Sequence, residues 1–138
     1  MIFLDTNIFI RYFEQEDGNE ISARTSVLFT DIVGGQISCF TNTMVITEII
    51  WVLEKYYNWP KEEVCDNIDF ILNTPNIKIR ERSILQKAVS VYRINNIDFI
   101  DAYNYSYIKS NNASAIYSYD LHFDKLADIY SDIERITP

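Results

Sequence analysis

The chain has 138 residues, of which 48% are hydrophobic, and this content excludes a largely disordered protein. Its 12 Lys and Arg against 20 Asp and Glu give a formal net charge of −8, which argues against a protein that coats nucleic acid by charge alone. His122 is the single histidine, and Cys39 and Cys65 lie in separate apolar runs, so a zinc site is close to excluded and both thiols are expected to be buried. We expect residues 1–138 to form one domain.

The apolar segments are short. None reaches the ~20 residues that a membrane span needs. The N-terminus lacks the basic and long apolar regions of a secretory signal. We therefore expect a cytoplasmic protein that does not enter a membrane.

Short apolar runs alternate with longer stretches of helical periodicity, which is typical of an α/β fold built on a parallel sheet. The first strand, Ile2–Leu4, is continuously apolar, as in a strand that is covered on both faces. The N-terminal half is expected to run, in chain order, as a strand at 2–4, helices at 8–13 and 20–33, a strand at 37–40, and helices at 45–56 and 60–72. The apolar residues that recur on one face of the third helix, and are expected to be buried, are Val45, Ile49, Val52, Leu53 and Tyr56.

The C-terminal half continues the alternation. It is expected to run as a strand at 77–79, helices at 83–94 and 98–109, a strand at 115–117, a short helix at 123–127 and a last strand at 133–136. Asparagine pairs at 95–96 and 111–112 end the two long helices of this half.

Two aspartates lie just past the carboxyl ends of predicted strands. Asp5 follows the first strand, and Asp120 follows the strand at 115–117. Because ligand sites of open parallel sheets form outside the carboxyl ends of the strands, these two carboxylates would face each other if their strands are neighbours. Each aspartate also has an ordinary interpretation as a helix N-cap or turn residue.

Three further carboxylates fall in predicted helices. Glu48 lies in an apolar run, where a glutamate either points to solvent or is buried with a partner or a metal. Asp98 and Asp101 are three residues apart, so both lie on one side of a first helical turn. We expect Asp98 to cap this helix and Asp101 to be the candidate ligand.

Carboxylates that are brought together repel one another unless a cation lies between them. With oxygen donors and no His or Cys partner, the expected cation is hard, Mg²⁺ or Mn²⁺. Such an ion activates water and offsets the charge that grows on a phosphodiester during cleavage.

Four segments, taken together, resemble the four acidic motifs of PIN-domain nucleases, in the family's order and over nearly the whole chain. These segments are Phe3–Ile8, Ile46–Leu53, Asp98–Ala102 and Ser118–Asp124. The length of the chain is similar to that of the stand-alone VapC-type toxins of bacterial and archaeal toxin–antitoxin pairs.

The resemblance implies a three-layer α/β/α PIN-like fold with a central parallel sheet of about four or five strands. It also implies a metal-dependent endoribonuclease in which one or two Mg²⁺ or Mn²⁺ ions activate water for RNA cleavage. The residues that would hold the metal and carry the catalysis are Asp5, Glu48, Asp101 and Asp120.

The resemblance extends to supporting residues and partners. Asn7 and Ser118 would orient the metal ligands or a metal-held water, whereas Asp98 and Asp124 are expected to be structural. VapC-type toxins of type II pairs commonly form homodimers and bind an antitoxin whose tail enters the acidic groove, so the same partners are expected here.

Other interpretations of the same residues stay open. A phosphoacceptor module on a similar sheet would also have acidic residues at its strand ends. Such a module would require a Lys after a late strand, where this chain has Asp120. A docking module without nuclease activity is disfavoured by the intact acidic set. The basic residues that either contact phosphate or are simply solvated are Arg11, Lys55, Arg80, Arg82, Arg93 and Lys109.

Overall fold

The computed structural model describes residues 1–130 and 132–138. The chain forms two compact units, unit 1 at Met1–Arg82 and unit 2 at Ser83–Pro138, which are taken in turn below. The single domain expected over residues 1–138 stays a prediction.

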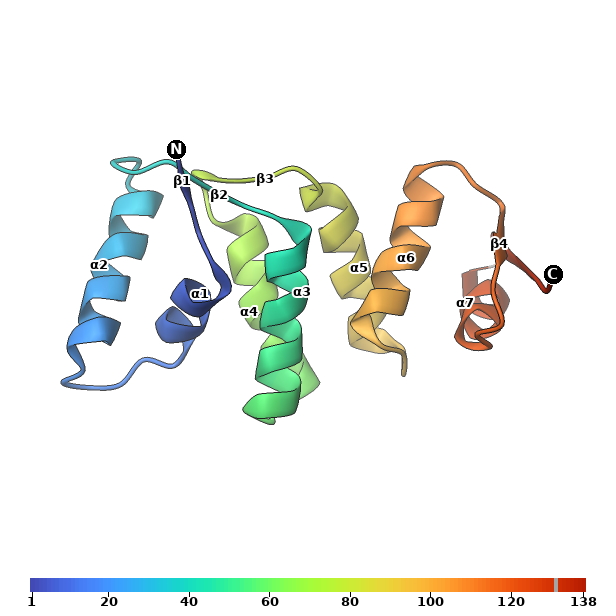
Figure 1. The fold of residues 1–138 in the computed structure, drawn as a ribbon, viewed down its shortest axis with the longest axis horizontal. Helices are drawn as coiled ribbons and strands as arrows, with labels where there is room; N and C mark the ends of the chain where they lie inside the picture. The colour runs from blue at the N-terminus through green and yellow to red at the C-terminus, as the bar shows by residue number, and fades with distance from the viewer. Residues whose placement is uncertain (131) are drawn as a thin grey trace. The chain divides into compact units, whose positions relative to one another are not determined.

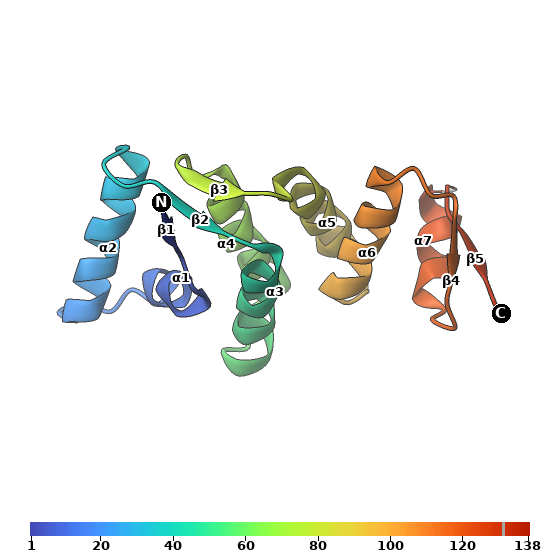
Figure 2. The same ribbon diagram turned by 45° about the horizontal axis from the view of Figure 1, so that its top comes forward.

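Unit 1 is built on a parallel sheet with the strand order β1-β2-β3. Ile2 of β1 pairs with Cys39 of β2, which pairs with Ile77 of β3, so the carboxyl ends of the three strands meet at one edge. Figures 1 and 2 show α3 and α4 side by side next to β2 and β3. The elements of this unit are β1 (Ile2–Phe3), α1 (Thr6–Phe13), α2 (Glu20–Val33), β2 (Cys39–Thr41), α3 (Thr43–Trp51), the π-helical η1 (Val52–Tyr56), α4 (Lys61–Asn73) and β3 (Ile77–Ile79).

The strands of unit 1 bury alternate side chains. In β2, Cys39 is buried and Phe40 is exposed, as the twofold period of a strand requires. In β1, Ile2 and Phe3 are 58% and 42% exposed, so the prediction that this strand is covered on both faces is wrong. Of the predicted strand at 2–4, only Leu4, at 2% exposed, is buried.

An aromatic cluster joins three helices of unit 1. The ring of Tyr12 in α1 stacks on Phe29 of α2 at a centroid distance of 4.1 Å and on Phe70 of α4 at 5.5 Å. Phe9, fully buried one turn earlier, packs on Phe29 at 5.9 Å. These contacts anchor α1, the helix that begins directly after Asp5.

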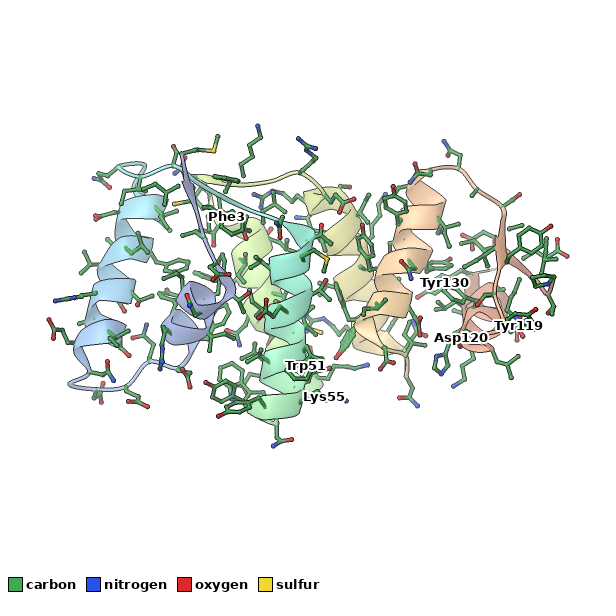
Figure 3. All side chains as sticks on the ribbon, in the orientation of Figure 1. Phe3, Trp51, Lys55, Tyr119, Asp120 and Tyr130 are labelled. Atoms are coloured by element: carbon green, nitrogen blue, oxygen red, sulfur yellow. The ribbon has the colours of Figure 1, made fainter. Side chains whose placement is uncertain are left out.

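The helix that carries Glu48 changes its winding at its C-terminal end. Val45, Ile49 and Leu53 are buried as expected, but Tyr56 is 74% exposed, so its predicted burial is wrong. Tyr56 is the last residue of η1, and a π-helical turn holds more residues than an α-helical turn, so the spacing that defines an α-helical face does not apply there. Trp51, 59% exposed, and Lys55 lie near the end of this helical rod (Figure 3).

Unit 2 combines three helices with a two-stranded parallel sheet. Ala115 of β4 pairs with Glu134 of β5, and Tyr117 pairs with Ile136. Figure 2 shows both strands beside α7. The elements are α5 (Arg82–Ile94, which begins at the last residue of unit 1), α6 (Phe99–Ser110), β4 (Ala115–Tyr117), α7 (His122–Tyr130) and β5 (Glu134–Ile136).

A polar network ties α6 to the segment before β5. The Tyr105 hydroxyl donates to Asp132 Oδ1 at 2.7 Å, and Lys109 Nζ lies 2.6 Å from Asp132 Oδ2. Burial and the bond to Asp132 raise the pKa of Tyr105, so the phenol remains a proton donor. The Lys109 ammonium also lies 5.4 Å from the centre of the Tyr105 ring, a cation–π contact.

The predicted elements agree with the structure to within three residues at each end, and all five strands have parallel partners. Cys39 and Cys65 are both buried, as expected. In the part of the chain that the structure describes, no helix is long and apolar enough to cross a membrane.

The helix caps give a direct test of this fold. Asn42 accepts a hydrogen bond from the Val45 amide at the start of α3, whereas Asp98 occupies the N-cap position of α6 without a side-chain capping bond. Asn42→Ala should therefore lower the free energy of unfolding by ~1 kcal/mol. Asp98→Ala should cost less than about 0.5 kcal/mol in about 0.5 M NaCl, where the attraction to the helix dipole is screened. Urea denaturation measures both, and equal losses would contradict the two cap geometries.

Candidate functional site

Asp5 is fixed where β1 passes into α1. The Leu4 amide donates to the Phe40 carbonyl at 2.9 Å, and the Thr41 hydroxyl donates to the Leu4 carbonyl at 2.9 Å, so the chain is held on both sides of Leu4. Asp5 follows as the N-cap of α1, with Oδ1 accepting from the Thr6 amide at 2.8 Å. Its side chain is exposed at the carboxyl end of the strand, as the sequence predicts.

Glu48 lies in α3 and joins the same corner of unit 1 through Thr6. The hydroxyl of Thr6, which is only 6% exposed, donates to Glu48 Oε2 at 3.0 Å. Of the two alternatives for Glu48, solvent-facing or buried, the structure shows an exposed residue. The hydrogen bond from Thr6 nevertheless holds its carboxylate in place. One threonine thus donates its amide to Asp5 and its hydroxyl to Glu48.

Unit 2 holds the second pair of carboxylates. Asp101 lies in the first turn of α6, and its side chain is 16% exposed. Asp120 lies between β4 and α7, beside Tyr119 in Figure 3. His122 Nδ1 lies 3.0 Å from Asp101 Oδ2 and 3.3 Å from Asp120 Oδ1, so one imidazole bridges the two carboxylates.

The turn that carries Asp120 is ordered by its own hydrogen bonds. The Asp120 amide donates to Ser118 Oγ at 2.9 Å, and Asp120 Oδ1 accepts from the His122 amide at 2.9 Å. The Ser118 amide donates to the Ile136 carbonyl, and its carbonyl accepts from Arg135 Nη1. Ser118 therefore orients the acidic turn through Asp120.

Asp124 is structural, in line with the sequence prediction. Its two oxygens accept from Arg135 Nε at 2.7 Å and from Nη2 at 2.9 Å. These charge-assisted bonds hold the pKa of Asp124 below its ordinary value. The pair joins α7 to β5 behind the turn at Asp120.

Asp5 and Glu48 thus meet at Thr6 in unit 1, and Asp101 and Asp120 meet at His122 in unit 2. Asn7 is exposed in the first turn of α1, and its role toward a metal stays a prediction. Thr6 and His122 are the two residues that sequence reasoning did not assign to the site. The sequence signal that could have identified them is a hydroxyl or imidazole side chain within two residues of an aspartate that follows a strand.

The acids of unit 2 suit a divalent cation. One ligand atom each from Asp101, Asp120 and His122 lies within 4.8 Å of the others, a spacing that one ion can span. Two carboxylates and an imidazole can bind Mn²⁺ or a related ion, and the carboxylates alone are donors that Mg²⁺ accepts.

Some of the candidate phosphate-binding residues serve the fold instead. The Arg82 guanidinium donates to the carbonyls of Leu72 and Ile77, and Lys109 pairs with Asp132. Lys55 and Arg80 are exposed.

The Asp124–Arg135 pair predicts a measurable titration. Asp124 should titrate below the ordinary 3.8, so the pair stabilises the fold above that pH and loses its effect as the pH falls through the lowered pKa. Arg135→Gln should return the pKa towards the ordinary value, whereas Arg24→Gln, which removes a surface pair with Glu20, should leave it unchanged. Carboxyl NMR shifts report this pKa. An ordinary value in the wild-type protein would contradict the pairing.

Residues 2–129 match the family model described as the PIN domain. The VapC ribonuclease of Aquifex aeolicus (strain VF5) is 22% identical over 126 residues, which cover 91% of this chain and 92% of that protein. The crystal structure of VapC20 from Mycobacterium tuberculosis, described as a sarcin-ricin loop cleaving toxin, aligns over 91% of this chain and 95% of its own, with 14% identity and a TM-score of 0.41. The family match spans both units and confirms the predicted α/β/α PIN-like fold: the chain belongs to the PIN domain family.

Proposed function

We propose that this protein is a metal-dependent endoribonuclease and the toxin of a type II toxin–antitoxin pair. The observation that carries the proposal is the convergence of Asp101 and Asp120 on one imidazole, because such carboxylates repel unless a positive charge or a proton donor lies between them. Membership of the PIN family and the similarity to a VapC ribonuclease support RNA as the substrate.

Four acids, Asp5 and Glu48 in unit 1 and Asp101 and Asp120 in unit 2, would hold the metal and carry the hydrolysis. A divalent ion, Mg²⁺ or Mn²⁺, would supply an activated water and offset the negative charge that develops on the phosphodiester. Thr6 would hold Glu48 in its ligating position, and Ser118 would do the same for Asp120 through the turn. Because these side chains are fixed by neighbours, little reorganisation would be needed when metal and RNA bind.

The proposed partners follow from the same comparison. The similarity to a VapC protein supports a cognate antitoxin, whose tail would compete with RNA for the acidic groove. We also propose a homodimer in the cytoplasm. Exposed aromatic side chains such as Trp51 and Tyr56 are of the kind that is enriched in protein interfaces.

The two aspartates of the third motif separate catalysis from structure. Asp101→Asn keeps the size of the side chain but removes the charge that would hold the metal, so it should abolish Mg²⁺-dependent RNA cleavage with little change in melting temperature. Asp98→Asn should keep most of the cleavage activity, because Asp98 lies at the N-cap of α6. Cleavage of a labelled RNA and thermal melting are measured for both variants.

Two outcomes for Asp101→Asn and Asp98→Asn would contradict these roles. If Asp101→Asn cleaves RNA at the wild-type rate while Asp98→Asn is inactive, the roles of the two aspartates are reversed. If both variants cleave at the wild-type rate, the acidic site is not the source of the activity.

A further inference from the structure

His122 is held at the acidic turn by its backbone as well as by its ring. Its amide donates to Asp120 Oδ1 at 2.9 Å, where α7 begins. Its ring is 44% exposed, so the imidazole is not a packed core side chain. The position of Nδ1 between Asp101 and Asp120 is therefore determined by polar contacts and the local turn.

The distances around Nδ1 match those between neighbouring ligands of one metal ion. In an octahedral site with bonds of about 2.1 Å, adjacent ligand atoms are about 3.0 Å apart. Nδ1 lies 3.0 Å from Asp101 Oδ2 and 3.3 Å from Asp120 Oδ1. The same distances also fit hydrogen bonds from Nδ1 to the two carboxylates. Whether Nδ1 ligates a metal therefore depends on the chemistry of the bound cation.

A divalent ion bound by the two carboxylates would have Nδ1 within reach as a further donor. The ring must then either turn away or present its lone pair to the ion. The backbone bond to Asp120 keeps the residue beside the carboxylates, which favours ligation over departure. A neutral imidazole is a common ligand of divalent transition metals.

We infer that His122 Nδ1 is a third ligand of the metal bound by Asp101 and Asp120, and that it biases the site towards Mn²⁺ over Mg²⁺. This inference rests on the proposed metal-dependent function. Nitrogen donors suit Mn²⁺ and its first-row neighbours, whereas Mg²⁺ prefers oxygen ligands and retains its waters. The sequence motifs alone suggested an all-oxygen site with no such preference.

Mn²⁺ and Mg²⁺ affinities test the preference on the full-length protein. His122→Ala should weaken Mn²⁺ binding, measured from the EPR signal of free Mn²⁺, by at least about 10-fold. Mg²⁺ binding, measured by competition, should change by less than about 3-fold. Tyr119→Ala is the matched control, because it removes an exposed ring from the same turn and should alter neither affinity.

Pulsed EPR of the Mn²⁺-loaded wild-type protein tests ligation directly and needs no variant. Imidazole ligation predicts a nitrogen hyperfine coupling that disappears in His122→Ala, and this result would support the inference. No nitrogen coupling, or equal losses of Mn²⁺ and Mg²⁺ affinity, would overturn it.

RNA cleavage separates the failure of this inference from that of the proposed function. If nitrogen coupling is absent but Mg²⁺-dependent cleavage is intact, only the role of His122 is wrong. If the wild-type protein binds neither ion and cleaves no RNA, the inference and the proposed function fail together.

Discussion

Repulsion between carboxylates is the constraint that shapes this protein's candidate site. Each pair of acids is held together by one residue that donates to both acids or bridges them. Thr6 gives its amide to Asp5 and its hydroxyl to Glu48. The imidazole of His122 lies within hydrogen-bond distance of Asp101 and Asp120. In water such pairs would separate, so the fold must supply these partners where the acids meet.

Both pairs follow one local plan. A strand ends two or three residues before an aspartate, and a helix begins one or two residues after it. The bridging residue, Thr6 in α1 or His122 in α7, is the first residue of that helix, and the second acid comes from a different helix, α3 or α6. The carboxyl end of a strand and the start of a helix are thus used twice, once in each unit. The local turn fixes one acid of each pair, and tertiary packing brings the other.

Most of the fold could be predicted because local patterns determine it. The strands at 77–79 and 115–117 and the helix at 20–33 agree with their predicted bounds. The π-helical turn that exposes Tyr56 could not be predicted, because the apolar spacing fits an uninterrupted α-helix. The side chain of Asp98 makes no capping bond although its residue type and position favour one. The bridging roles of Thr6 and His122 depend on contacts with acids 42 and 21 residues away, which no local pattern encodes.

The central proposal is that these acids bind a divalent metal ion. The most direct measurement is the Mn²⁺ affinity of Asp5→Asn beside that of Asp120→Asn, with thermal melting to confirm that both variants fold. The account predicts that each substitution weakens Mn²⁺ binding by at least about 10-fold. Unchanged Mn²⁺ binding by either variant would contradict the proposal for the acid that the variant replaces.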